Sequence, residues 1–164
     1  MTELAGVQHP PPEGDTWLAI SEAPLPISAA YEWAIRPECG AVVLFSGTAR
    51  DHSIGRDDVT LLEYEAYEDQ VVPRLRSVVD ELRVRWPDVV RVAMIHRVGP
   101  VPVTESAVVV AVSSPHREAS FLSGRFAIDA LKSSVPIWKR ETWSDGESWG
   151  LEPQHIVEVG NANP

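Results

Sequence analysis

Lysine is nearly absent from this chain of 164 residues. Only Lys132 and Lys139 occur, while the other twelve basic side chains are arginines. Arginine keeps its proton in proteins, whereas a lysine that is desolvated or beside another cation can act as a base, an acid or a nucleophile. Two lysines so close in sequence therefore indicate a site that requires an amine. The simpler alternative is two surface lysines paired by chance.

Cysteine is also scarce, since Cys39 is the only one in the chain. An intramolecular disulfide is excluded, which favours a reducing compartment. Cys39 precedes the apolar run 40–45, so we expect a buried and inert thiol there. The sequence lacks the basic start and apolar core of a signal peptide, and no apolar stretch has membrane-spanning length. We therefore expect a cytoplasmic protein.

Several catalytic and ligand-binding motifs are missing. There is no Walker A loop, no Gly-x-Gly-x-x-Gly after a predicted strand and no Gly-x-Ser-x-Gly elbow. The histidines are His9, His52, His96, His116 and His155. None is spaced from a second histidine or cysteine as zinc ligands are, so we predict neither a metal nor a cofactor. His96 ends a predicted strand, where a structural role is the usual one.

Composition and charge are those of an ordinary globular domain with an acidic surface. Apolar residues make up 44% and charged residues 23%, while the net charge is -10 and the pI about 4.9. This balance argues against nucleic acid or an acidic membrane as partner. The segment 116–140 is locally basic, with Arg117, Arg125, Lys132, Lys139 and Arg140 against Glu118 and Asp129. It indicates a site for one small anion, or else a solvated helix face.

The apolar pattern predicts one α+β domain over residues 15–155, with a disordered N-terminal tail at 1–14 and a C-terminal tail at 156–164. Predicted strands cover 17–20, 40–49, 60–67, 89–98, 106–113 and 136–143, and predicted helices cover 28–36, 68–86 and 114–132. The strand at 40–49 is apolar enough to be covered on both faces. We expect a polar loop at 50–58 and a turn at 99–102.

The helix that follows residue 113 is predicted to begin with Ser114 as its cap and Pro115 in its first position. Its buried face should contain Phe121, Gly124, Ile128 and Leu131. His116 and Arg117 would then occupy the first turn, where free backbone N–H groups and the helix dipole favour an anion. His116 serves equally well as a local cap.

Four sequence blocks resemble the large, catalytic subunit of molybdopterin synthase. These blocks are residues 40–52, 62–67, 95–99 with 114–117, and 132–141. The last block is the most specific, because it combines both lysines with Pro136 and Trp138 in the order Lys-x₃-Pro-Ile-Trp-Lys-Arg-Glu. The resemblance covers about residues 15–150. The chain departs from the family at Ala49, where valine is usual, at Pro115, where a small residue is usual, and in its proline-rich N-terminal extension.

The resemblance implies a fold and a reaction. The family fold is an α/β hammerhead with an additional small antiparallel sheet. Such subunits convert cyclic pyranopterin monophosphate, also called precursor Z, into molybdopterin by installing two sulfurs. The sulfur arrives as a C-terminal Gly-Gly thiocarboxylate on a ubiquitin-like small subunit. The assembly is a homodimer of large subunits within a heterotetramer.

The resemblance also implies the site residues, which are Thr48, Ala49, Arg50, His116, Arg117, Lys132, Lys139, Arg140 and Glu141. Arg50 and Arg117 would bind phosphate and oxyanions, and the two lysines would be the catalytic pair. Ile137 and Trp138 are candidates for the wall of a channel for the partner's tail, although Trp138 is as well explained as core. A helix that joins Arg117 to Lys132 spans about 22 Å, so a pocket containing both requires two protomers.

Two other functions compete with sulfur transfer. A non-catalytic module could keep the groove for the ubiquitin-like partner without turnover, but the intact lysine pair argues against it. A regulatory domain that senses a phosphorylated metabolite needs an anion site but no amine. It therefore leaves the lysine usage unexplained.

Overall fold

The computed structural model describes residues 7–149 and 158–159. Its larger sheet has the order β1 (Thr16–Ser21), β4 (Val92–Arg97), β6 (Ser106–Ser114) and β2 (Ala41–Thr48). β1 pairs with β4 in parallel, and the other two pairings are antiparallel. Within the described residues, no helix is long and apolar enough to cross a membrane.

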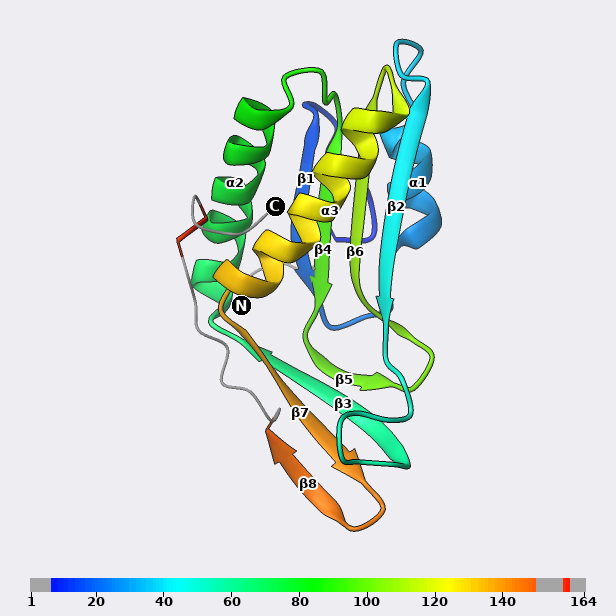
Figure 1. The fold of residues 1–164 in the computed structure, drawn as a ribbon, viewed down its shortest axis with the longest axis vertical. Coiled ribbons are helices and arrows are strands. Elements are labelled where there is room, and N and C mark those ends of the chain that lie inside the picture. The colour runs from blue at the N-terminus through cyan, green and yellow to red at the C-terminus, as the bar shows by residue number, and fades with distance from the viewer. Residues whose placement is uncertain (1–6, 150–157, 160–164) are drawn as a thin grey trace.

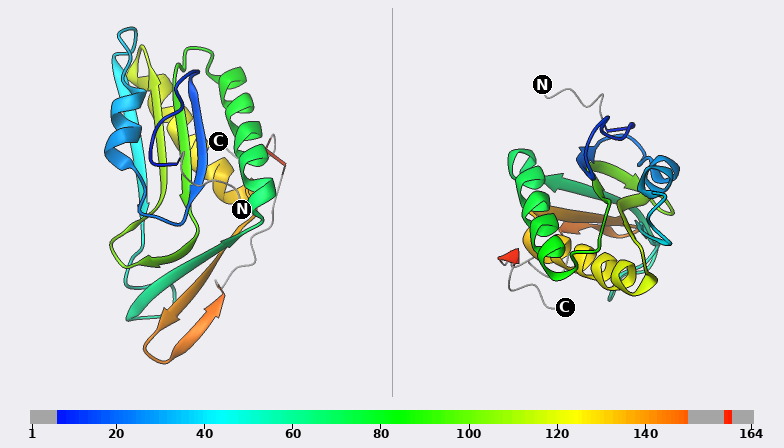
Figure 2. Two further views of the ribbon diagram at one scale, coloured as in Figure 1. Left: turned by 180° about the vertical axis from the view of Figure 1, so that it is seen from behind. Right: turned by 90° about the horizontal axis from the view of Figure 1, so that it is seen from above.

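Helices cover both faces of this sheet (Figures 1 and 2). α2 (Glu68–Arg85) and α3 (Arg117–Ser134) lie on one face, and α1 (Ile27–Ala34) lies on the other. Successive side chains of a strand point to opposite faces, so β4 supplies Val92 and Met94 to one core and Ala93 and Ile95 to the other. This explains why every residue of β4 is buried.

The second sheet extends from one end of the molecule, beyond the last turn of α3 (Figure 1). Its order is β5 (Gly99–Pro102), β3 (Val59–Ala66), β7 (Ile137–Trp143) and β8 (Gly146–Trp149), and all its pairings are antiparallel. The register of β3 and β7 sets Tyr64 opposite Lys139 and Leu62 opposite Glu141. Over the part of the chain that the structure describes, two sheets and three helices confirm the predicted α+β fold with an additional small antiparallel sheet.

Two strand predictions need correction. Residues 99–102 form β5 rather than a turn, because Pro100 and Pro102 occupy an edge strand, where proline's missing N–H is tolerated. β2 is in contact with helices on both faces, through Val43 toward α3 and through Val42 and Leu44 toward the α1 side, but it is less completely covered than predicted. It is an edge strand of the larger sheet, and all its residues are at least partly exposed. Phe45 of β2 is 36% exposed.

The start of α3 also differs from the prediction. Ser114 ends β6, and its hydroxyl donates to the carbonyl oxygen of His116 at 2.7 Å. His116 is the N-cap residue, with an extended backbone and no capping hydrogen bond from its side chain. Phe121 is 62% exposed rather than buried. The other predicted residues of that face, Gly124, Ile128 and Leu131, are buried. Ser120 is buried in place of Phe121, and the backbone of Gly124 packs closely against Val43.

The predicted tails lie only partly within the described residues. Residues 1–6, 150–157 and 160–164 are outside them. Val7 is buried and belongs to the core cluster that contains Trp17 and Leu25, and the Gln8 amide donates to the Pro24 carbonyl oxygen. Ordered packing therefore begins upstream of residue 15.

Candidate active site

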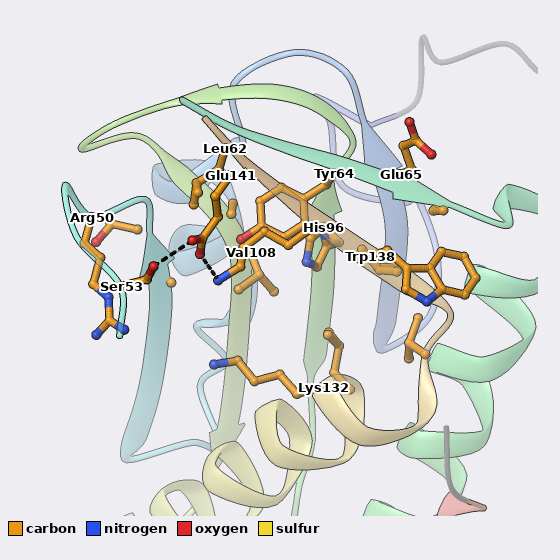
Figure 3. A pocket seen from close by; sticks show the side chains of 18 of the residues that line it. Arg50, Ser53, Leu62, Tyr64, Glu65, His96, Val108, Lys132, Trp138 and Glu141 are labelled. Atoms are coloured by element: carbon orange, nitrogen blue, oxygen red, sulfur yellow. Dashed lines mark hydrogen bonds and ion pairs between the residues drawn. The ribbon is translucent and has the colours of Figure 1, made fainter. Parts of the chain in front are cut away.

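A cavity of about 1390 Å³ lies where the C-terminal end of α3 meets the second sheet (Figure 3). Its lining residues come from β2, the loop after β2, β3, β4, β6, the end of α3, β7 and β8. The predicted site residues that line it are Thr48, Arg50, Lys132, Lys139 and Glu141. The structure therefore brings both lysines of the chain into one cavity.

Lys132 lies in the last turn of α3, where the helix dipole favours a cation. Figure 3 shows its side chain extending from the helix into the cavity, while Tyr64 and Glu141 face it from the second sheet. The positive charge of Lys132 contributes to lowering the pKa of His96, so its amine lies within electrostatic reach of that ring. Lys132 enters from the helix, and Lys139 enters from the sheet.

Lys139 and Glu141 share one face of β7, because they are two residues apart on a strand. The Nζ atom of Lys139 lies 2.8 Å from Oε1 of Glu141. The other carboxylate oxygen, Oε2, accepts hydrogen bonds from the Ser53 hydroxyl at 2.7 Å and from Arg56 Nη1 at 2.9 Å. Burial would raise the pKa of Glu141, but the contacts from Lys139, Ser53 and Arg56 outweigh it and hold that pKa below its ordinary value.

Tyr64 and His96 form a neutral wall of the cavity. Their rings meet edge to face, with centroids 5.0 Å apart. His96 Nδ1 lies 2.6 Å from the Arg97 carbonyl oxygen, which can only accept, so Nδ1 carries the proton. Burial lowers the pKa of His96 to about 4, and the charge of Lys132 adds to the effect. Burial and the charge of Glu141 raise the pKa of Tyr64 to about 12, so both rings are uncharged near neutral pH.

Two other predicted site residues are sequence neighbours of lining residues but do not line the cavity themselves. Arg140 points to the opposite face of β7, where its guanidinium pairs with Glu63 at 2.8 Å and with Glu147 at 3.8 Å. Ala49 is buried, and its backbone N–H donates to the Glu105 carbonyl oxygen at 2.9 Å. Ala49 therefore fixes the backbone from which the exposed Arg50 reaches the cavity.

His116 and Arg117 lie at the other end of α3 from the cavity. They are the N-cap and first residue of this helix, both are exposed, and neither lines the cavity. Lys132 lies fifteen residues after Arg117 in the same helix, about 22 Å along its axis. The cavity of one chain therefore contains the lysines but lacks this predicted anion-binding pair.

Sequence reasoning missed four side chains of the site, namely Ser53, Arg56, Tyr64 and His96. The alternation in 59–66 could have placed Tyr64 on the inward face of β3 with Leu62. No local signal marks Ser53 or Arg56, because their partner Glu141 lies more than eighty residues away. Cys39 is half-buried in the connection between α1 and β2 rather than buried, and it does not line the cavity.

Comparisons with known proteins agree with this architecture. The family model of the MoaE protein matches residues 20–134. Molybdopterin synthase catalytic subunit 1 of Aedes aegypti is 46% identical over 131 residues, which cover 80% of this chain and 84% of that protein. The crystal structure of molybdopterin synthase from Staphylococcus aureus superposes with a TM-score of 0.76 at 37% identity, covering 81% of this chain and 96% of that one.

A more distant structure shares the fold. A complex of subunits 1 and 2 of the molybdopterin-converting factor from Helicobacter pylori matches with a TM-score of 0.66 at 22% identity. The match covers 84% of this chain and 92% of the solved chain.

The fold and the site define the class of this protein. It is a mixed α/β enzyme subunit whose smaller sheet, together with the end of one helix, forms a cavity with two amines. The chain belongs to the MoaE family, whose relatives are molybdopterin synthase catalytic subunits.

Proposed function

We propose that this chain is the sulfurtransferase subunit that converts cyclic pyranopterin monophosphate to molybdopterin. The observation that carries the proposal is the convergence of Lys132 and Lys139 on one cavity from different elements. Charge on the substrate changes as sulfur replaces oxygen, and positioned amines can transfer protons and stabilise that charge. Because Tyr64 and His96 are uncharged near neutral pH, the positive charge along the cavity comes from the lysines and Arg50, and of these only the lysines can also release a proton.

The sulfur comes from a partner protein in this proposal. The only cysteine, Cys39, does not line the cavity. The donor is the Gly-Gly thiocarboxylate of a ubiquitin-like small subunit. The cavity of about 1390 Å³ exceeds the roughly 300–1,000 Å³ of ordinary ligand sites, which leaves room for an extended tail beside the substrate. Tyr67 and Trp138 form an edge-to-face pair at the wall, with ring centroids 5.0 Å apart.

The substrate-binding residues come from two protomers. Thr48 and Arg50 belong to the same cavity as the lysines. His116 and Arg117 of a second copy complete the anion site, because the length of α3 separates them from the lysines of their own chain. Arg50 and Arg117 bind the phosphate through charge-assisted hydrogen bonds. The assembly is a homodimer that carries one small subunit at each end.

Glu141 takes a different role from the one expected of a substrate ligand. Its side chain is only 4% exposed, and both of its oxygens are occupied by protein groups. It holds Lys139 in place rather than contacting substrate. We place the reaction in the cytoplasm, because a chain with a single cysteine needs no oxidising compartment.

Mass spectrometry of the reaction product tests this function. The wild-type protein is mixed with thiocarboxylated small subunit and cyclic pyranopterin monophosphate, and we expect a product that has gained two sulfurs. The same small subunit with an ordinary carboxylate terminus is the control and should give no product. Tight binding of the thiocarboxylated subunit without any sulfur in the product would instead support a non-catalytic binding module.

A further inference from the structure

The loop between β2 and β3 contains a tight turn that ends beside Glu141. Ser53 and Arg56 form a two-way backbone bridge, with both N–H···O distances at 3.0 Å. Gly55 at the tip has φ +74, a conformation that glycine adopts without strain. The turn therefore presents the Ser53 and Arg56 side chains together, and both donate to Oε2 of Glu141.

Arg56 is more buried and makes more contacts than an ordinary surface arginine. Its side chain is 10% exposed, and its guanidinium lies over the Trp143 ring at 4.3 Å from the centroid. One guanidinium nitrogen donates to Glu141 at 2.9 Å, and the other donates to the Ser148 hydroxyl at 2.5 Å. The contacts fix the planar group in one orientation and link the turn to β7 and β8.

The two oxygens of the Glu141 carboxylate serve different partners. Oε2 is anchored by Ser53 and Arg56, while Oε1 contacts the Lys139 amine. Because the anchored oxygen fixes the whole carboxylate, the position of Lys139 depends on a residue that does not touch it. We propose that Arg56 is a positioning residue, which places the Lys139 amine for the reaction by way of Glu141. This inference rests on the proposed function of the lysines.

Loss of Arg56 should change both the position of the Glu141 carboxylate and the balance of charges around it. The charged and titratable groups that face Glu141 are Lys139 on its own strand, Arg56 from the turn, Tyr64 from β3 and, across the cavity, Lys132 from α3. Without Arg56, the carboxylate keeps its contact with Lys139 but is held at Oε2 by Ser53 alone, so the carboxylate and the amine should shift together. The carboxylate also loses a charge that favours its ionised form.

Steady-state kinetics of Arg56→Gln, Arg56→Lys and Arg36→Gln test the proposal. Arg36 is a matched control, because it pairs with Glu38 on the exposed surface. We expect Arg56→Gln to lower kcat on the order of tenfold to hundredfold, as small displacements of a catalytic group do, with KM for cyclic pyranopterin monophosphate unchanged. Arg56→Lys should recover part of kcat, and Arg36→Gln should match wild type.

Lysine ¹³C NMR gives a readout that does not need turnover. With lysine labelled at Cε, the chain should give only two side-chain signals, because Lys132 and Lys139 are its only lysines. We expect Arg56→Gln to shift the Lys139 signal and to leave that of Lys132 in place. On acidification, the change in the Lys139 signal that reports protonation of Glu141 should occur at higher pH in Arg56→Gln than in wild type.

The two experiments separate failure of this inference from failure of the proposed function. If wild type makes no product but the Lys139 signal shifts in Arg56→Gln, the sulfurtransferase function fails and the link from Arg56 to Lys139 stands. A folded Arg56→Gln protein with wild-type kcat and an unshifted Lys139 signal overturns the inference. If Arg56→Gln does not fold, Arg56→Lys carries the test, since it keeps the charge and loses the paired contacts to Glu141 and Ser148. Wild-type kcat and an unshifted Lys139 signal in that variant would likewise overturn it.

Discussion

A mixed dimer of two inactive variants tests whether each active site takes residues from both protomers. Arg117 and Lys132 are fifteen residues apart in one unbroken helix, about 22 Å along its axis. The cavity that holds Lys132 does not include Arg117 of the same chain. Arg117→Ala and Lys132→Ala should therefore each inactivate the enzyme alone, by damaging different halves of a shared site.

The expected recovery follows from the two-fold arrangement. After complete subunit exchange, about half of the dimers are mixed, and one of the two sites in each mixed dimer is intact, so activity should recover to about one quarter of wild type. The assay is product formation before and after exchange, with native mass spectrometry to count mixed dimers. Proven exchange without recovery would show that Arg117 and Lys132 act within one chain.

Two further predictions concern Cys39 and His96. Cys39→Ser should keep wild-type sulfur transfer when thiocarboxylated small subunit is supplied, because Cys39 does not line the cavity; lost activity in the folded variant would mean that the chain carries sulfur itself. The pKa of His96 in the folded protein is about 4, below the 6.5 of an ordinary histidine. The contribution of His96 to the free energy of unfolding is therefore fully present above pH 6.5, and it decreases by roughly 3 kcal/mol as the pH falls toward 4. Urea unfolding of wild type and His96→Gln near neutral pH and near pH 4 should show this loss only in wild type, and equal losses in both would contradict it.

The sequence predicts the larger part of the fold because its signals are local. The helix Glu68–Arg85 follows from the apolar spacing of Val71, Leu75, Val78 and Leu82, which pack into the core. Whether a strand lies at the edge of a sheet is not a local property, because it depends on which strands pair with one another. β2 is as apolar as a central strand, and only the strand order shows that one of its edges is unpaired. Residues 99–102 look like a turn because proline usually breaks strands, except at an edge such as β5.

The sequence predicts the site residues that belong to a rare residue type. It does not indicate those that enter the site through a contact between segments far apart in the chain. Two lysines among fourteen basic residues draw attention to 132–139, and both line the cavity. For the other predicted residues of β7, the face of the strand decides whether the side chain enters the cavity. Lys139 and Glu141 point inward, while Arg140 between them points outward to Glu63. The contact of Arg56 with Glu141 crosses from a loop to a strand, and no spacing in the sequence indicates it.

Single-turnover sulfur transfer by Lys132→Arg and Lys139→Arg tests the central claim most directly. Arginine keeps the positive charge at each position but cannot release a proton in a protein. If the amines transfer protons during sulfur transfer, each variant should fold normally and form product about two orders of magnitude more slowly than wild type, or slower still. Near wild-type rates in both variants would show that the lysines supply charge alone and would contradict the account.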